Sequence, residues 1–400
     1  QQFLKLAHYK GFAVIIDVVY NHFGPRDLDL WQFDGRFYTD GGGIYFYNDW
    51  RAKTPWGHTR PDYGRPEVRQ YIRDNALMWL DEFHADGLRV DMTAYIRNVN
   101  ADGNPANDIP DGHRLMKWIN QEINTRFPHK IVIAEDMHEL NYVTERLDRS
   151  GLGFDSQWDA KFVHTIRANL IQEKDEYRNL IAAEQAILHQ YNNDAFRRVV
   201  YTESHDEVAN GRARLPEDIN PGQADSWFSK KKAALGAMMV MTAPGIPMLF
   251  QGQPLLEDKW FSDTDPLDWG RLETFEGNVR LYQHLIQLRR NWYDHTRGLR
   301  GHNTKTIYLN QQKNVIVYHR WESAGPRDSV IVALNISNQK HEQIEVQFPF
   351  PAHWYTRFNS DAKIYDDSYT NYGVSSVKTD QNGRGIIRLA PYSGMIMSVG

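Results

Sequence analysis

Cysteine is absent from this chain of 400 residues, which excludes disulfide bonds and thiol chemistry. A chain without cysteine fits a reducing compartment, so we expect a cytoplasmic location. Long hydrophobic runs are also missing, and no stretch approaches the length that a membrane-spanning helix needs. The sequence therefore predicts a globular protein that does not use a membrane as a partner.

A strong charge of one sign is missing as well. The chain has 46 Lys and Arg residues against 51 Asp and Glu residues, and its formal net charge is −5 with both signs interspersed. This balance gives no indication of a nucleic acid partner. No G-x-G-x-x-G or Walker-type loop and no H-E-x-x-H spacing occurs, so we expect no nucleotide cofactor and no metal. On residue type alone, a metal site built from Asp17, Asp91, Asp206 and the histidines stays open.

What the chain does contain is four apolar runs that each end in acidic residues. They are residues 12–22 (F-A-V-I-I-D-V-V-Y-N-H), 87–91 (G-L-R-V-D), 131–136 (I-V-I-A-E-D) and 199–207 (V-V-Y-T-E-S-H-D-E). Near-continuous Val and Ile without polar alternation predict parallel strands that are covered on both faces. Strands that deliver acids from their carboxyl ends to one place are typical of the active site of a (β/α)8 barrel.

The order of apolar runs and helical stretches predicts an α/β fold, with six βα units up to residue 292. We therefore expect a (β/α)8 TIM barrel that is N-terminally truncated, with the catalytic barrel over residues 1–297, from its third strand onward. Two further units are expected to precede Gln1, because a barrel must close. Short alternating runs with turns then predict a C-terminal antiparallel β-sandwich domain over residues 298–400, with strands near 315–320, 329–335, 343–348, 385–389 and 394–399.

A segment at about residues 23–66 is rich in Gly, Asp and aromatic residues and lacks periodicity, so we expect an inserted loop subdomain there. Aromatic side chains on such a loop could stack on sugar rings or pack the subdomain on itself, and the two interpretations carry equal weight. The residues concerned are Trp31, Phe33, Phe37, Tyr38, Tyr45, Phe46, Tyr47, Trp50 and Trp56.

Two of the four segments carry paired residues with a chemical meaning. Arg89 and Asp91 lie two positions apart on one predicted strand, so their side chains point to the same side. A neighbouring Arg favours the ionised form of an Asp, which suits a nucleophile. Glu135 is next to Asp136, and crowded carboxylates favour protonation of one of them, which suits a proton donor. A nucleophilic carboxylate opposed by a protonated carboxyl is the machinery of a retaining glycosidase or transglycosylase. The alternative is that Arg89 and Asp91 form only an ion pair inside the barrel.

The remaining polar residues at the strand ends have more general roles. Asp206 would be a third acid, expected to hold sugar hydroxyls and favour an oxocarbenium-like transition state. His22 and His205 are neutral donors that suit sugar hydroxyls. Asp17 is expected to be structural and to orient one of its polar neighbours, Asn21, His22 or Arg89.

In this order, D-V-V-Y-N-H, G-L-R-V-D, I-A-E-D and S-H-D-E resemble the four signature regions of the α-amylase superfamily of glycoside hydrolases. The resemblance covers essentially the whole chain. It implies Asp91 as the nucleophile, Glu135 as the acid/base and Asp206 as the transition-state stabiliser. It also implies one sugar subsite lined by Arg89, His22 and His205, with Asn21 in support.

Within the superfamily, the resemblance is strongest to 1,4-α-glucan branching enzymes, through the runs at 153–158 (G-F-D-S-Q-W), 204–208 (S-H-D-E-V), 249–253 (L-F-Q-G-Q) and 265–269 (D-P-L-D-W). It implies a retaining transglycosylase that cleaves α-1,4 bonds of glycogen, starch or maltooligosaccharides and forms α-1,6 branches. Two departures keep an α-amylase-like or trehalose-releasing hydrolase open: the run M-T-A-Y follows Asp91 where branching enzymes usually carry Ala-Val, and T-P-W-G stands at 54–57. A carbohydrate-binding protein on a degenerate barrel is a third hypothesis, and the presence of all three acids disfavours it.

Overall fold

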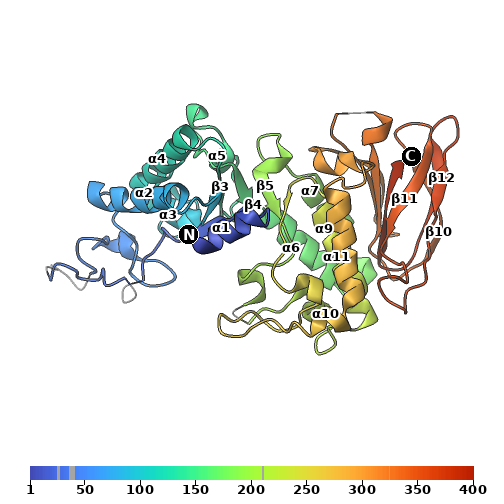
Figure 1. Ribbon diagram of the computed structural model, residues 1–400, viewed down its shortest axis with the longest axis horizontal. Coiled ribbons are helices and arrows are strands. Elements are labelled where there is room, and N and C mark those ends of the chain that lie inside the picture. The colour runs from blue at the N-terminus through green and yellow to red at the C-terminus, as the bar shows by residue number, and fades with distance from the viewer. Residues whose placement is uncertain (25–27, 36–40, 210, 324) are drawn as a thin grey trace. The chain divides into compact units, whose positions relative to one another are not determined.

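The computed structural model describes residues 1–24, 28–35, 41–209, 211–323 and 325–400 (Figure 1). Contacts divide the chain into two compact units, Gln1–Ala160 and Lys161–Gly400, and each is described by itself. Within these described ranges, six parallel strands, four in the first unit and two in the second, confirm the predicted α/β class and the count of six βα units. Among the described residues, no helix is both long enough and apolar enough to cross a bilayer.

The first unit is built around four parallel strands that pair in chain order, β1 (Ile15–Val18), β2 (Gly87–Val90), β3 (Ile131–Ala134) and β4 (Ser156–Trp158). The strands alternate with helices, as βα units require. These helices are α1 (Gln2–Tyr9), α2 (Pro66–Asp81), α3 (Thr93–Arg97), α4 (Pro110–Arg126) and α5 (Asn141–Thr144). Short 3-10 turns at Trp50–Ala52, Pro105–Asn107 and Leu147–Arg149 complete the described connections.

Helix α2 shows how the sequence produces this packing. Pro66 stands at the first helical position, where a missing backbone N–H costs nothing. Val68, Ile72, Ala76 and Leu80 follow at intervals of four, so they form one stripe, and all four are buried with strands β2 and β3 in one core. Each fully buried Val, Ile or Leu contributes about 1.5–3 kcal/mol relative to exposure.

The register of the sheet sets the level at which the acids emerge. Asp17 on β1 pairs with Arg89 on β2, and Arg89 pairs with Ile133 on β3. Gly87 permits the close approach of β2 and β3, because a Cβ there would lie 2.4 Å from the carbonyl oxygen of Ile131. The residues directly after β2 and β3 therefore leave the sheet at the same edge.

In the second unit, β5 (Arg198–Val200) and β6 (Ile246–Pro247) pair in parallel. The apolar run at residues 246–250 forms only this short strand, because the Met248 N–H still donates to the Val200 carbonyl oxygen but the Phe250 N–H donates to the Gln253 side chain. The helices of this unit are α6 (Ala160–Ile171), α7 (Leu180–Leu188), α8 (Leu215–Ile219), α9 (Trp227–Thr242), α10 (Arg271–Thr274) and α11 (Glu276–Arg289).

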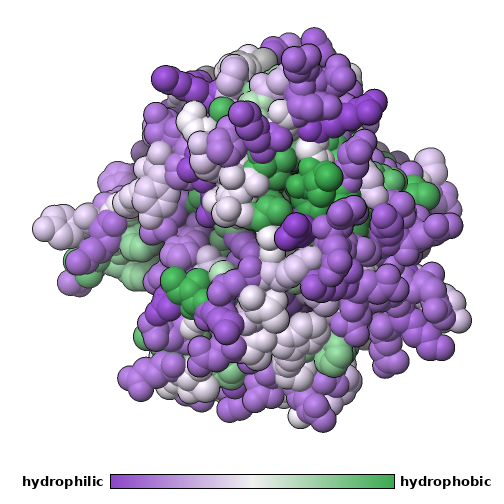
Figure 2. Space-filling view, turned by 90° about the vertical axis from the view of Figure 1, so that its right-hand side faces the viewer, coloured by the Kyte–Doolittle hydropathy of each residue, from purple (hydrophilic) through white to green (hydrophobic). Residues whose placement is uncertain are grey.

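The C-terminal part of the second unit is antiparallel, as predicted. A six-stranded sheet has the order β12-β11-β14-β9-β8-β7, and β10 pairs with β13 in a second sheet. The strands are β7 (Asn303–Asn310), β8 (Val315–Trp321), β9 (Val330–Asn335), β10 (His341–Gln347), β11 (His353–Asn359), β12 (Ser376–Lys378), β13 (Arg384–Leu389) and β14 (Ser393–Val399). Strands β7, β11 and β12 had no counterpart in the sequence prediction. Figure 2 shows the side of the molecule that carries these strands, where hydrophilic residues surround a few hydrophobic patches.

The six-stranded sheet is buried on both faces. One face shares a core with the second sheet, formed by residues such as Val317, Trp354 and Ile387. The other face joins a core with α9 and α11, to which Ile316 and Val332 contribute. The expected domain boundary at 297–298 therefore marks a change of secondary structure within one compact unit.

Candidate active site

Arg89 is the centre of the polar cluster at the carboxyl edge of the first unit. Its Nη1 donates to Asp17 Oδ1 at 2.6 Å and to Asp91 Oδ1 at 2.8 Å, and its Nη2 lies 2.7 Å from Glu135 Oε2. The guanidinium also stacks 4.5 Å from the ring centre of Trp158. The structure thus brings three predicted acids to one buried cation: one lies on β1, and the other two directly follow β2 and β3.

The charged side chains that contact the Arg89 guanidinium are all carboxylates. Burial alone would lower the pKa of Arg89, but the carboxylates of Glu135, Asp17 and Asp91 raise it above its ordinary value. Glu135 is 3% exposed, whereas the side chain of Asp17 is 56% exposed. The buried contacts to Glu135 and Asp91 consequently carry most of the electrostatic interaction, because water screens the third contact.

Glu135 is held by the chain segment that follows Asp91. The Met92 N–H donates to Glu135 Oε2 at 2.9 Å, and the Thr93 N–H donates to the Glu135 carbonyl oxygen at 2.8 Å. Met92 has φ 33° and ψ 59°, a left-handed conformation that is strained for a residue with a side chain. The turn after β2 is therefore closed onto the end of β3 by two backbone N–H groups.

Asp136, the residue next to Glu135, is held by partners from helix α3. Its side chain is fully buried and accepts hydrogen bonds from Arg97 Nε at 3.1 Å, Arg97 Nη2 at 3.0 Å and Thr93 Oγ1 at 2.9 Å. Burial raises the pKa of Asp136, but hydrogen bonding with His138 and the charge of Arg97 bring it below its usual range. Asp136 is therefore held in its ionised form, and the protonation expected of one carboxyl of this pair stays a prediction for Glu135.

A second chain of contacts leads from Asp91 to the inserted loop. Asn21 Nδ2 donates to Asp91 Oδ2 at 2.7 Å and to the Asp91 carbonyl oxygen at 2.9 Å, and Asn21 is itself fully buried. The Asn21 Oδ1 lies 2.5 Å from His22 Nδ1. The His22 ring stacks on Trp56, with ring centres 4.4 Å apart and an interplanar angle of 9°, and Tyr95 meets Trp56 edge-on. Burial lowers the pKa of His22, which keeps a neutral ring at neutral pH although Asp91 opposes the shift.

The aromatic residues of the loop differ in their burial. Phe46 and Tyr47 are buried within the core of the first unit, while Trp50 and Phe33 are exposed. Phe37 and Tyr38 lie outside the described residues. Trp56 contacts the candidate site through His22.

His205 and Asp206 lie in the second unit, shortly after β5. His205 Nε2 is 3.3 Å from Asp206 Oδ2, and the side chain of Asp206 is 51% exposed. The ring of His205 meets Phe261 at a centroid distance of 6.4 Å, and the Phe261 N–H donates to the Val208 carbonyl oxygen at 2.8 Å. Asp206 is thus presented to solvent on a segment that is tied down by its neighbours.

The acids that flank Asp206 are engaged in contacts inside the second unit. Burial raises the pKa of Glu203, whose carboxyl accepts from Arg214 and from the Leu215 N–H. Glu207 lies 3.1 Å from His164 Nε2 and 3.2 Å from Arg212 Nη1. These contacts favour structural roles for Glu203 and Glu207.

Three groups at the site were not assigned there from the sequence: the ring of Trp158 beneath Arg89, the backbone N–H of Met92, and the ring of Trp56 against His22. The runs G-F-D-S-Q-W and T-P-W-G contain the two tryptophans, so a signal existed for them. A backbone donor in a left-handed turn leaves no signal in side-chain identity. Within the described part of the chain, no group of three or more His, Asp or Glu side chains is arranged to hold a metal ion.

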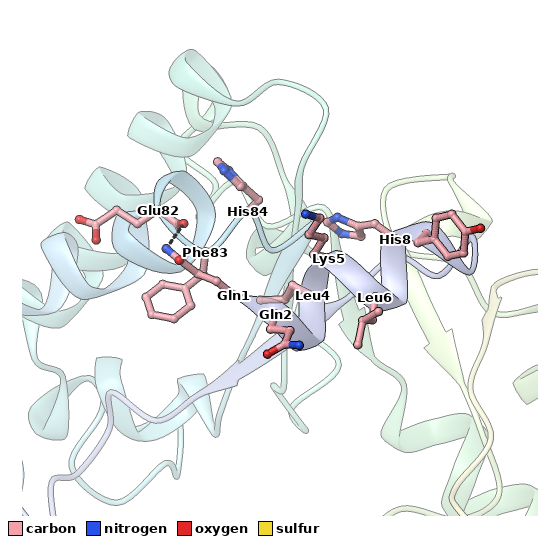
Figure 3. A pocket seen from close by; sticks show the side chains of 10 residues that line it. Gln1, Gln2, Leu4, Lys5, Leu6, His8, Glu82, Phe83 and His84 are labelled. Carbon is pink, nitrogen blue, oxygen red and sulfur yellow. Dashed lines mark hydrogen bonds between the residues drawn. The ribbon is translucent and has the colours of Figure 1, made fainter.

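A cavity of about 900 Å³ lies elsewhere in the first unit (Figure 3). It is lined by α1 and the end of α2, where Gln1 Nε2 donates to the Glu82 carbonyl oxygen at 3.0 Å. None of the predicted site residues lines it. Cavity volume alone therefore does not locate the acid cluster, which depends on charge and strand register.

Comparisons with known proteins bear on this geometry. Residues 58–298 match the family described as alpha amylase, catalytic domain, and residues 308–400 match alpha amylase, C-terminal all-beta domain. The 1,4-alpha-glucan branching enzymes GlgB of Corynebacterium diphtheriae and Bacillus subtilis are each 28% identical, covering 94% and 92% of this chain and 52% and 57% of their own lengths. That of Frankia casuarinae is 30% identical over 90% of this chain and 45% of its own length. The chain thus spans about half the length of these curated relatives.

Among solved structures, a pullulanase from Anoxybacillus sp. LM18-11, complexed with maltotetraose, superposes with a TM-score of 0.66. It shares 18% sequence identity and covers 98% of this chain and 55% of its own, so the likeness concerns the fold alone. Together with the parallel and antiparallel sheets, it confirms the predicted fold class, a TIM-barrel domain followed by an all-β domain.

Proposed function

Because the chain belongs to the α-amylase family of enzymes, we propose that it is a retaining α-glucan transglycosylase, and specifically a 1,4-α-glucan branching enzyme. The observation that carries the proposal is the shared guanidinium of Arg89, with Asp91 on one terminal nitrogen and Glu135 on the other. Contact with one small cation keeps the two carboxylates close. A retaining mechanism requires this closeness, with about 5–5.5 Å between the carboxyl groups, whereas an inverting one needs room for a water molecule.

In the first step, the Asp91 carboxylate attacks the anomeric carbon of an α-1,4-linked glucosyl residue. The bond between that carbon and the bridging oxygen breaks, a bond to an Asp91 oxygen forms, and Glu135 gives its proton to the departing oxygen. The hydrogen bonds of Asn21 and Arg89 to Asp91 fix its orientation for the attack. Positioning of this kind supplies a large part of the rate of such reactions.

In the second step, the 6-hydroxyl of another glucan chain approaches the glycosyl-enzyme. Glu135, now a carboxylate, removes the hydroxyl proton, the new α-1,6 bond forms, and Asp91 leaves as a carboxylate. Inversion in each of the two steps retains the α configuration. Arg89 stabilises Asp91 whenever that residue carries its charge.

The remaining predicted residues take supporting roles in this proposal. Asp206 and His205 would hold the hydroxyls of the glucosyl residue and favour its oxocarbenium-like transition state, and exposed carboxylate and imidazole groups suit that task. His22 would bind the same residue: its Nδ1 faces Asn21 Oδ1 and so carries the ring proton, which leaves Nε2 of the neutral ring to accept a hydrogen bond from a sugar hydroxyl. Asp17, which contacts Arg89, would support the cation from the β1 side.

The partner in this proposal is an α-1,4-glucan, namely glycogen, starch or a maltooligosaccharide, and no cofactor takes part. The similarity to several GlgB branching enzymes supports transfer to a sugar hydroxyl. We also propose a cytoplasmic location, which the absence of cysteine supports. Neither nucleic acid nor a membrane is a partner in this account.

Product analysis on amylose tests the proposal. We expect new α-1,6 signals in the proton NMR spectrum with little gain in reducing ends, and no change with the Asp91→Asn variant as a control. Rising reducing ends without branches would make the protein a hydrolase that uses the same residues, and released trehalose would identify the type. Glucan binding without any turnover would favour a carbohydrate-binding protein instead.

A further inference from the structure

The segment that follows Asp91 is fastened to Asp136 by two side chains of helix α3. Thr93 Oγ1 donates toward Asp136 Oδ2 at 2.9 Å, and Arg97 contributes two further bonds, from Nε to Oδ2 and from Nη2 to Oδ1. All three residues are buried, with exposures of 0% for Thr93, 4% for Arg97 and 0% for Asp136. We refer to Thr93, Arg97 and Asp136 as the α3 clamp.

The clamp joins the two chain segments that carry the proposed nucleophile and the proposed acid/base. Asp136 directly follows Glu135, and Thr93 comes two residues after Asp91. Thr93 also donates its N–H to the Glu135 carbonyl oxygen at 2.8 Å and approaches it with Oγ1 at 3.1 Å. The clamp therefore fixes the turn after β2 relative to the end of β3.

Met92 supplies an independent reason why a clamp is needed. Its left-handed conformation (φ 33°) is unfavourable for a residue with a Cβ, and such strain persists only where the surroundings enforce it. In that conformation the Met92 N–H reaches Glu135 Oε2 at 2.9 Å. Without the clamp, Met92 could relax to an ordinary conformation, which would turn Asp91 and withdraw this donor from Glu135.

We propose that Thr93 and Arg97, through Asp136, are positioning residues that hold Asp91 and Glu135 in their reactive geometry. This inference rests on the proposed function and adds residues to it that the signature motifs do not contain. Misplacement of a reacting group by about 1 Å can cost about 100-fold in rate. The effect should appear in kcat and leave KM nearly unchanged, because the clamp is buried and does not meet the glucan.

The test compares two substitutions of Thr93 in the full chain, with amylose as the substrate. Thr93→Val keeps the shape of the side chain and removes the hydroxyl, whereas Thr93→Ser keeps the hydroxyl. We expect Thr93→Val to lower kcat about 10–100-fold with KM within about threefold of wild type, and Thr93→Ser to restore most of the rate. Thr59→Val is the matched control, because Thr59 is buried and its hydroxyl has no partner among the described residues.

A substitution that relieves the backbone strain at Met92 distinguishes a loss of positioning from a general loss of stability. Asn adopts the left-handed conformation more readily than Met. Met92→Asn should therefore raise kcat at least about threefold in the Thr93→Val background and by less in the wild-type background. If Thr93→Val fails to fold, Arg97→Lys takes its place, because a lysine cannot reproduce both guanidinium bonds to Asp136.

The outcomes distinguish a failure of the α3 clamp from a failure of the proposed function. An active wild-type protein whose kcat is unchanged in Thr93→Val and Arg97→Lys would overturn the clamp and leave the proposed function standing. A kcat loss that Thr93→Ser does not restore would also overturn it. A wild-type protein without activity on amylose would overturn the proposed function, and this inference with it.

Discussion

Replacing Arg89 by methionine should destabilise the protein by about 4 kcal/mol, because it removes the cation that three carboxylates share. The contact with Glu135 joins side chains that are 8% and 4% exposed, and the contact with Asp91 joins side chains that are 8% and 15% exposed. Loss of one partner of a buried pair costs about 3–5 kcal/mol, since the remaining charge has no compensation. The contact with Asp17, whose side chain is 56% exposed, adds less than about 1 kcal/mol.

Arg89→Lys gives the intermediate case. Its ammonium keeps the charge but cannot present two terminal nitrogens to two carboxylates, so we expect a loss of about 1.5–3 kcal/mol. Arg73→Met is the matched control in the same unit: its ion pair with Glu122 joins side chains that are 23% and 25% exposed, and its loss should cost about 1 kcal/mol. Urea unfolding, followed by fluorescence and circular dichroism, gives the three free energies. A value for Arg89→Met equal to that for Arg73→Met would refute the electrostatic reasoning.

Other perturbations test separate parts of the account. Gly112→Ala should destabilise the first unit by about 1–3 kcal/mol in thermal unfolding, because the new Cβ would lie 1.8 Å from the Ile96 carbonyl oxygen in α3; a neutral result would contradict the close packing of α3 on α4. The contact with Asp136 raises the pKa of His138 above 6.5, so its contribution to stability is complete below about pH 6.5 and is lost as the pH rises through the folded-state pKa. We therefore expect His138→Gln to lower the free energy of unfolding by about 0–1 kcal/mol at pH 5.5 and by less at pH 8.5. The effect is small because the His138 side chain is 31% exposed and its Nδ1 lies 3.5 Å from Asp136 Oδ1. A loss of stability that grows with pH would be inconsistent with this pairing.

Strand identity was predictable because buried parallel strands require continuous apolar residues, and few other elements produce runs such as I-V-I-A. The position of the acids at one edge of the sheet could be predicted from the same runs, since an acid directly after a parallel strand lies at the carboxyl end of that strand. Arg89 was one of three expected partners of Asp17, but the choice among them and the contact of Arg89 with Glu135 could not be read from spacing, because both depend on the register of three strands. Only the contact with Asp91 is local in the sequence.

The partners of Asp136 could not be read from the sequence for a related reason. Adjacent acids look like an interacting pair in the sequence, but the carboxylate of Asp136 is bound by two side chains of α3. Its partners, Thr93 and Arg97, belong to a helix of five residues that is too short to show a period. In the C-terminal domain, β11 was missed because aromatic residues on both of its faces hide the alternation expected of a strand.

Trapping of the glycosyl-enzyme tests the central claim most directly. Fluoride leaves without help from an acid, so the Glu135→Gln variant should still react with α-maltosyl fluoride but should then lack the base for the second step. We expect a maltosyl adduct to accumulate, and peptide mass mapping should place it on Asp91. An adduct on another carboxylate such as Asp206, or no adduct while fluoride is released, would contradict the assignment of Asp91 and Glu135.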